Sequence, residues 1–98
     1  MSGMIFEWDD AKDIANQQKH GLGFVDAAKV FADPLRVTRP DRVEHGETRW
    51  QTVGMVGRHR IILVAHTIWD AEGNEIIRII SARPVTKPER RDHEEQDS

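Results

Sequence analysis

Hydrophobic positions in the first third of the chain follow strand spacing and then helical spacing. Residues 4–8 alternate between apolar and polar side chains, which favours a first strand. Asp9 or Asp10 suits the start of a helix that runs to about Lys19, and Gly21 suits its end. A second helix is predicted by an apolar stripe at positions i, i+3, i+4 and i+7, formed by Phe24, Ala27, Ala28 and Phe31.

The spacing becomes extended in the rest of the chain. Residues 35–39 indicate a weak strand, and residues 40–48 are polar and favour a loop. Residues 50–56 and 60–69 predict two strands joined in a tight hairpin around Gly57. The nearly continuous apolar run in the second of these strands places it near the centre of a sheet.

The last strand, residues 76–83, is rich in isoleucine, as expected for a strand buried on both faces. Two arginines interrupt it. Strict alternation places Arg78 and Arg83 on opposite faces of the sheet. Pro84 ends the strand because proline cannot donate a hydrogen bond to the ladder. Arg83 is therefore expected at the strand end, where it can bind an anion.

The predicted element order is β-α-α-β-β-β-β-α. The last, short C-terminal helix rests on Thr86 and Glu89, which have the spacing of a capping box. We expect an α+β domain in which two N-terminal helices pack on an antiparallel sheet. A single domain should span residues 1–91, and the acidic tail at residues 92–98 should fray.

Composition and charge exclude some classes of function. The 98 residues include no cysteine, which rules out disulfides and thiolate zinc sites. No apolar run approaches the roughly 18 residues of a membrane span, and no secretion signal is visible, so we expect a cytoplasmic location.

Charge is distributed unevenly, although the net charge is only −3. Residues 1–33 hold three Lys or Arg against six acids, and residues 92–98 hold four acids. Residues 34–91 hold eleven Lys or Arg against seven acids, and ten of the eleven are arginine. Arginine suits bidentate binding of phosphate or carboxylate. A solvated surface of mixed charge explains the enrichment equally well.

Several motifs occur in order along most of the chain. The first is an F-x-W-D-x-x-K-x-x-x-N-x-x-K-H-G pattern that begins at Phe6 and ends at Gly21. Later come Gly46-Glu47-x-Arg49, Gly54, the Ile79–Arg83 segment and Glu89-Arg90. This ordered set resembles the BrnT family of toxins from type II toxin–antitoxin modules.

The resemblance implies a RelE/ParE-like fold and a metal-independent ribonuclease that inhibits translation. It also implies an RNA substrate, no cofactor, and neutralisation by a DNA-binding antitoxin, BrnA, in a hetero-oligomer. The arginine-rich middle of the chain agrees with an RNA-binding surface, but the composition alone does not establish one.

Metal-free RNA cleavage needs a base, an acid and fixed positive charge. Lys19 and His20 are candidates for proton transfer, since histidine titrates near neutral pH; as cations at a helix end they equally suit a capping role. Arg83 is the best candidate for stabilising the transition state, with an ion pair as the alternative. Arg49 is a second, with pairing to Glu47 on the same strand face as the alternative.

Substrate binding is assigned to a wider set of basic residues, among which Arg78 has antitoxin binding as its alternative: Arg58, His59, Arg60, Arg78 and Arg90. His66 lies in an apolar strand and is expected to pack in the core. No spacing of His, Asp or Glu predicts a metal site.

Two other functions remain open from the sequence. A non-catalytic toxin of this type would bind and inhibit a protein such as DNA gyrase. A DNA-binding or scaffold partner would have no toxicity, but no helix-turn-helix, zinc site or strongly basic total charge supports it.

Overall fold

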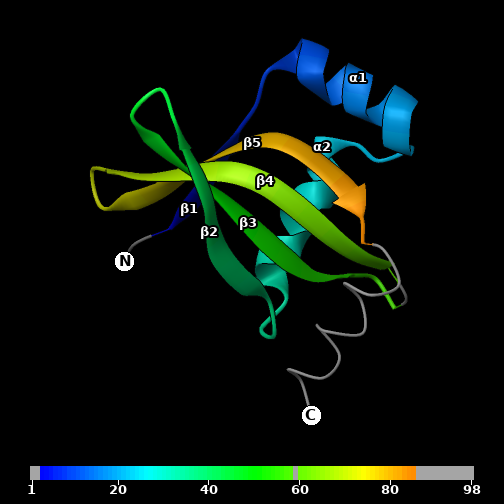
Figure 1. Ribbon diagram of the computed structural model, residues 1–98. Helices are drawn as coiled ribbons and strands as arrows, with labels where there is room; N and C mark the ends of the chain where they lie inside the picture. The colour runs from blue at the N-terminus through cyan, green and yellow to red at the C-terminus, as the bar shows by residue number, and fades with distance from the viewer. Residues whose placement is uncertain (1–2, 59, 86–98) are drawn as a thin grey trace.

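A single five-stranded mixed sheet forms the centre of the computed structural model, which describes residues 3–58 and 60–85. The strand order is β1-β5-β4-β3-β2 (Figure 1). The strands are β1 (Met4–Glu7), β2 (Val37–Glu44), β3 (Glu47–Val56), β4 (Arg60–Ala71) and β5 (Asn74–Pro84).

Strands β2 to β5 form an antiparallel meander. Two-residue turns join β2 to β3 and β4 to β5. His45 and Gly46 have φ of 52° and 75°, and Glu72 and Gly73 have φ of 54° and 82°. Positive φ at both central residues matches the right-handed twist of the paired strands. The predicted hairpin around Gly57 is confirmed.

The predicted loop at residues 40–48 is wrong, because β2 and its turn occupy it. β2 is an edge strand whose residues are mostly exposed. Such a strand has no buried face, so its sequence lacks alternation, and its charges and Pro40 are typical of a protected edge.

Strand β1 pairs in parallel with β5, from the Met4–Glu75 pair to the Glu7–Arg78 pair. The expected antiparallel sheet is therefore wrong. The hydrophobic pattern of a four-residue strand does not specify which edge it joins or in which direction.

Two short helices and a 3-10 turn lie against the sheet: α1 (Asp10–His20), α2 (Phe24–Ala27) and η1 (Ala28–Ala32). Helix α1 agrees with its prediction: Asp9 Oδ1 accepts from Lys12 N at 3.1 Å, and Gly21 ends it with φ of 65°. The predicted second helix is only one α turn followed by η1. No helix among the described residues is long and apolar enough to cross a membrane.

Contact with β3 holds η1 tightly to the sheet. A Cβ at Gly54 would lie 2.9 Å from Val30 Cγ1 and 3.1 Å from the Val30 carbonyl oxygen. Asp33, which follows η1, accepts a hydrogen bond from Met55 N at 2.8 Å. Glycine at position 54 therefore allows the backbone of η1 to approach β3.

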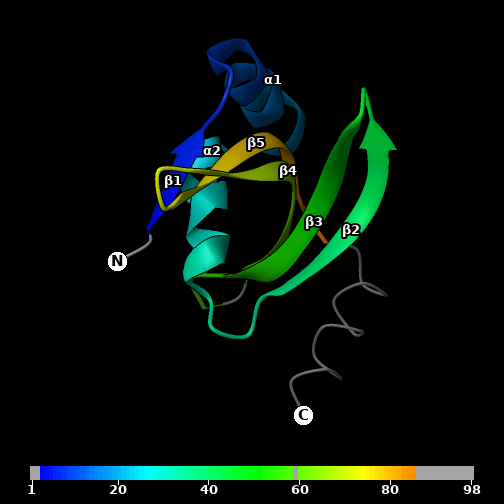
Figure 2. The same cartoon turned by 90° about the vertical axis from the view of Figure 1, so that its left-hand side faces the viewer.

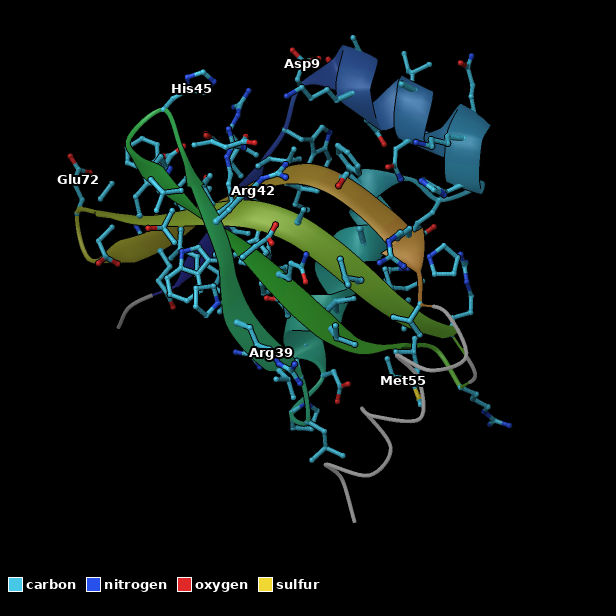
Figure 3. All side chains as sticks on the ribbon, viewed as in Figure 1. Asp9, Arg39, Arg42, His45, Met55 and Glu72 are labelled. Carbon is cyan, nitrogen blue, oxygen red and sulfur yellow. The ribbon has the colours of Figure 1, made fainter. Side chains whose placement is uncertain are left out.

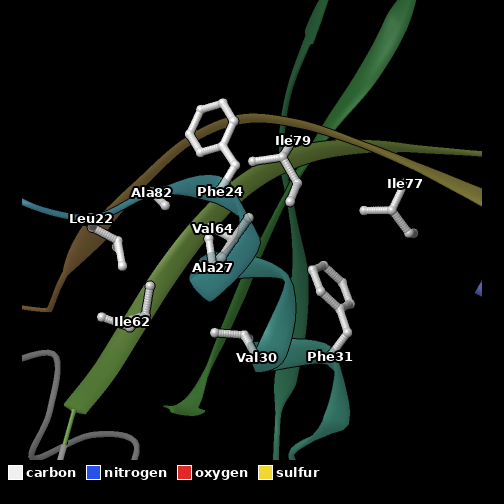
Figure 4. Packing of buried hydrophobic residues seen from close by; sticks show 10 residues of the cluster. All are labelled: Leu22, Phe24, Ala27, Val30, Phe31, Ile62, Val64, Ile77, Ile79 and Ala82. Atoms are coloured by element: carbon white, nitrogen blue, oxygen red, sulfur yellow. The ribbon is translucent and has the colours of Figure 1, made fainter. Parts of the chain in front are cut away.

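The core lies between the helical segments and one face of β3, β4 and β5 (Figure 4). Burying each large apolar side chain contributes about 1.5–3 kcal/mol. The fully packed side chains come from both layers: Leu22, Phe24, Ala27, Val30, Phe31, Ile62, Val64, Ile77, Ile79 and Ala82.

The expected RelE/ParE-like fold, with two N-terminal helices on an antiparallel sheet, is thus wrong. The structure is dominated by a mixed sheet, with only two short helices among the described residues. The predicted C-terminal helix and the tail at residues 92–98 lie outside the described residues.

Candidate active site

The sheet has a second face, turned away from α2 and η1 (Figure 2). On β4 the core residues Ile62 and Val64 point toward the helices, so Leu63 and Thr67 point to the opposite side. Cross-strand pairing extends this second face over the whole sheet. We call it the arginine face, after five residues that share it: Arg39, Arg42, Arg49, Arg78 and Arg83.

One row of residues crosses the arginine face from edge to edge. Arg42 pairs with Arg49, and Thr67 pairs with Arg78, which pairs with Glu7. Arg49 and Thr67 are the next residues beyond the Trp50–His66 pair, where the β2–β3 and β4–β5 hairpins separate (Figure 1). We call Arg42, Arg49, Thr67, Arg78 and Glu7 the arginine row.

Two β-bulges place these arginines on one face. In β5 the register passes from Ala65–Ser81 to His66–Ile79, so Ile80 is the extra residue. Arg78 and Arg83 consequently face the same side, and the predicted opposite placement is wrong. Bulges occur frequently next to functional sites, where they redirect a side chain.

The second bulge lies on β2, one residue pair closer to the β2–β3 turn. There Asp41 is the extra residue between the Pro40–Trp50 and Arg42–Arg49 pairs. Arg39 and Arg42 therefore share a face although three positions separate them (Figure 3). Strict alternation would have divided both pairs of arginines between the two faces.

Carboxylates at both ends of the arginine row hold the arginines in place. Glu44 Oε1 lies 2.9 Å from Arg42 Nε, and Glu44 Oε2 lies 3.6 Å from Arg49 Nε. Arg78 Nη1 donates to Glu7 Oε1 at 3.4 Å. The carboxylate recorded beside Arg49 is thus Glu44 on β2 and not the expected Glu47. The pairs of Arg42 and Arg78 are exposed and contribute only about 0–1 kcal/mol, so a phosphate can replace the carboxylate there.

The arginine row also contains two buried polar atoms without a hydrogen-bond partner among the described residues. They are Thr67 Oγ1 and Arg49 Nε. Thr67 is 1% exposed and carries its hydroxyl between two arginine-bearing strands. An unpaired buried polar group costs about 1–3 kcal/mol. A ligand oxygen would recover this cost when the side chains that cover the atom move aside.

Helix α1 brings Lys19 and His20 to the end of β5. Asn16 Nδ2 donates to the Ala82 carbonyl at 2.9 Å, and Asn16 Oδ1 accepts from Ala82 N at 3.2 Å. The Asn16 amide thereby makes the hydrogen bonds to β5 that a neighbouring strand would make, at a position beyond the end of β1. His20, one helical turn later, is half-buried, and Lys19 is exposed.

The sequence analysis missed Asn16 as a positioning residue. The available signal was a single asparagine in a helix whose other residues suit an exposed surface. Asn16 is the buried residue of α1.

Arg83 lies two rows of side chains away from Arg78 along the same face, opposite Leu63. Their partners on β4, Leu63 and Thr67, are four positions apart, which corresponds to roughly 14 Å along the strand. Arg83 Nη1 donates to the Pro84 carbonyl at 3.3 Å. The proposed catalytic residues thus divide into an Arg49 group and a group of Lys19, His20 and Arg83, connected by the arginine face.

The other predicted binding residues lie elsewhere. Arg58 and Arg60 are exposed at the β3–β4 hairpin, at the opposite end of β4 from the arginine row. His59 and Arg90 lie outside the described residues. Among residues 3–58 and 60–85, no group of three or more His, Cys, Asp or Glu could hold a metal ion.

A hollow of about 440 Å³ lies between α1 and α2, on the helical side of the sheet. Asp13 and Asp26 line it together with glycines and Phe24, and none of the proposed site residues does. Asp13 Oδ1 accepts from Phe24 N at 2.8 Å, so that carboxylate joins the two helices.

His66 is a core residue, as predicted. It is completely buried and packs edge-on against Phe31. Its Nδ1–H donates to the Thr67 carbonyl at 3.2 Å, so Nε2 accepts from the Thr52 hydroxyl at 2.6 Å. Burial lowers the pKa of His66 below 6.5, although the Thr67 carbonyl acts in the opposite direction.

Acid is expected to destabilise the fold through His66. Below about pH 6.5 His66 in the unfolded chain binds a proton that the folded state disfavours. The free energy of unfolding therefore has its full value above this pH, as far as His66 determines it, and decreases as the pH falls below it. The slope per proton is at most about 1.4 kcal/mol per pH unit. In urea unfolding from about pH 4.5 to 7.5, His66→Gln should lose less stability on acidification than wild type. If stability depends on pH equally in both proteins, His66 is not the source of the acid sensitivity.

Comparisons with known proteins agree with the motif resemblance. No curated protein matches the chain. A solved structure, the Brucella abortus ribonuclease toxin BrnT, matches with a TM-score of 0.64 and 24% sequence identity, over 89% of this chain and 100% of that one. At this identity the match shows a shared fold. The family model of the ribonuclease toxin BrnT of type II toxin–antitoxin systems matches residues 8–89. Since that match spans most of the sequence, the chain belongs to the BrnT family of ribonuclease toxins.

Proposed function

We propose that this chain is an endoribonuclease that binds RNA across the arginine face and stops translation by cleaving it. The observation that carries the proposal is the arginine row, in which Arg78 pairs with Thr67 and Arg49 follows the last β3–β4 pair, while the Thr67 hydroxyl has no hydrogen-bond partner among the described residues. Family membership supplies the class of activity, and the arginine row supplies a surface that fits a phosphodiester.

The scissile phosphate is placed between Arg49 and Arg78. Each guanidinium would exchange a weak carboxylate contact for a phosphate oxygen, and Thr67 Oγ1 would donate a hydrogen bond to the same group. These donors are fixed by the strands before substrate arrives, as effective stabilisation of transition-state charge requires. Arg83, further along the face, is assigned to a neighbouring phosphate and to charge stabilisation there.

Proton transfer has two candidate sets of groups. Lys19 and His20 lie at the end of α1, on the side of Arg83. Glu7 lies beside Arg78 and is the carboxylate of the arginine row on β1. Both sets use side chains alone, and the arginines supply the positive charge, so we propose that cleavage requires no added metal ion.

Membership of a type II toxin family implies an antitoxin partner. We propose that this partner is a BrnA-like DNA-binding protein that forms a hetero-oligomer with the toxin in the cytoplasm. The alternative of a non-catalytic gyrase inhibitor depended on likeness to the ParE-type fold, which the mixed sheet does not have.

The test is controlled expression of this chain without an antitoxin. Cell growth and the integrity of total RNA are measured in the same culture. We expect growth to stop and RNA to be degraded within minutes. Purified toxin should cleave RNA in the presence of EDTA. Growth arrest with intact RNA, or no arrest despite soluble folded protein, would contradict the ribonuclease assignment; EDTA-sensitive cleavage would contradict metal independence alone.

A further inference from the structure

An apolar row lies beside the arginine row on the same face. Ile5 pairs with Ile76, and Ile76 pairs with Trp69, one row closer to the β4–β5 turn than Glu7, Arg78 and Thr67. Trp69 is 50% exposed and Ile5 is 47% exposed. Residues on neighbouring rows of one strand are about 7 Å apart, so Trp69 is one row from Thr67 on β4 and lies diagonally opposite Arg78 on β5.

Trp69 differs from the other tryptophans of the chain in its exposure, since Trp8 and Trp50 are half-buried. Ile76 and Ile5 continue the apolar surface from the indole toward the edge of the sheet. A large exposed aromatic ring that borders a cationic row is the combination that binds unpaired nucleotides, with bases stacked on the ring and phosphates on the cations.

We propose that Trp69 is the stacking platform for an unpaired base of single-stranded RNA, next to the phosphate held by the arginine row. The proposal rests on the proposed function and narrows its substrate to single strands. A duplex keeps its bases stacked on each other and offers none to an indole ring.

The surroundings favour RNA over a protein partner as the occupant. The centre of a protein interface is depleted in charged residues. Here the apolar row directly borders Glu7 and Arg78, the charged residues of the adjoining arginine row on β1 and β5. A single RNA strand carries negatively charged phosphates and flat apolar bases in alternation, so it complements this surface in both charge and shape.

The experiment compares wild type with Trp69→Leu, which keeps apolar volume without an aromatic ring, and with Trp69→Phe, which keeps a smaller ring. Ile14→Ala, on the exposed side of α1, is the control for loss of surface apolar area. The probes are a short single-stranded RNA with 2′-O-methyl groups at every position, which prevents cleavage, and the duplex of the same sequence. Affinity is measured by fluorescence anisotropy over a range of salt concentrations.

Trp69→Leu should bind the single strand about 5- to 100-fold more weakly, because each stacked base contributes that order of affinity. Trp69→Phe should retain most of the affinity, and Ile14→Ala should match wild type. The dependence of affinity on salt should not change, because no charge is removed. Duplex binding should be weak and insensitive to all three variants.

Two outcomes would overturn the proposal. Trp69→Leu could lose single-strand and duplex binding equally, or it could bind the single strand as tightly as wild type. If in the second case it also escapes neutralisation by the antitoxin in a growth assay, the apolar row binds the antitoxin. If wild type neither binds nor cleaves RNA, the proposed function itself fails, and that result is distinct from the first two.

Discussion

Arg78→Ala is expected to reduce the rate of RNA cleavage by about 10²- to 10³-fold at every pH, and Arg49→Ala should have a similar effect. The reason is that a preorganised charged donor stabilises the charge that develops on the phosphate in the transition state. Arg78→Lys keeps the charge but not the bidentate geometry, so it should recover only part of the rate. Single-turnover cleavage of a labelled RNA measures these rates.

Lys29→Ala is the matched control for loss of one positive charge. Lys29 is exposed on the helical side of the sheet and pairs with Asp26 at 3.0 Å. It should leave cleavage nearly unchanged. If Lys29→Ala and Arg78→Ala have equal effects, the arginine face acts only through its overall charge and the phosphate site is misplaced.

Thr67→Val gives an independent test of the same phosphate position. Valine has nearly the shape of threonine but lacks the hydroxyl, and that hydroxyl has no partner to lose within the described structure. The variant should therefore fold with unchanged or slightly higher stability and still cleave RNA more slowly. Unchanged cleavage would place the phosphate away from Thr67, whatever the arginine variants show.

The sequence predicted those elements whose limits depend on interactions between residues close together in the chain. Asp9 and Gly21 limit α1 because a carboxylate can cap free backbone N–H groups and glycine tolerates a left-handed conformation. The apolar run of β4 marked the central strand. Pairing of β1 with β5 joins residues about 70 positions apart, and no local pattern contains that information.

The arginine face could not be predicted from alternation, because alternation fails at Asp41 and Ile80. Each bulge shifts the arginine that follows it to the face of the arginine that precedes it. The same limitation hid the cross-strand partners: Glu44, and not Glu47, contacts Arg49 because the β2–β3 register and the bulge in β2 decide which carboxylate arrives there. Nothing in the sequence indicated the role of Thr67, because that role follows only from a buried hydroxyl that lacks a partner in the part of the chain that the structure describes.

If proton transfer occurs at the end of α1, His20→Ala is expected to reduce cleavage by about 10²- to 10⁴-fold and to remove one limb of the pH–rate profile, because a general acid or base acts in only one of its protonation states. Arg83→Ala should lower the rate at every pH without changing the shape of the profile. Lys19→Ala and Glu7→Gln test the two other residues proposed for proton transfer. All four residues are at least partly exposed, so circular dichroism should show folded protein with melting temperatures within a few degrees of wild type.

The shape of each profile identifies the group that moves the proton. If Glu7→Gln removes one limb of the pH–rate profile while His20→Ala keeps the wild-type profile, then Glu7 beside Arg78 is the base and His20 only caps α1. If His20→Ala removes a limb instead, proton transfer occurs at the end of α1. In that case the distance of roughly 14 Å from Arg78 to Arg83 means that RNA is cleaved beside Arg83, while the arginine row holds a neighbouring phosphate. Arg83→Ala should then reduce the rate more than Arg78→Ala, and the opposite order would place the scissile phosphate on the arginine row.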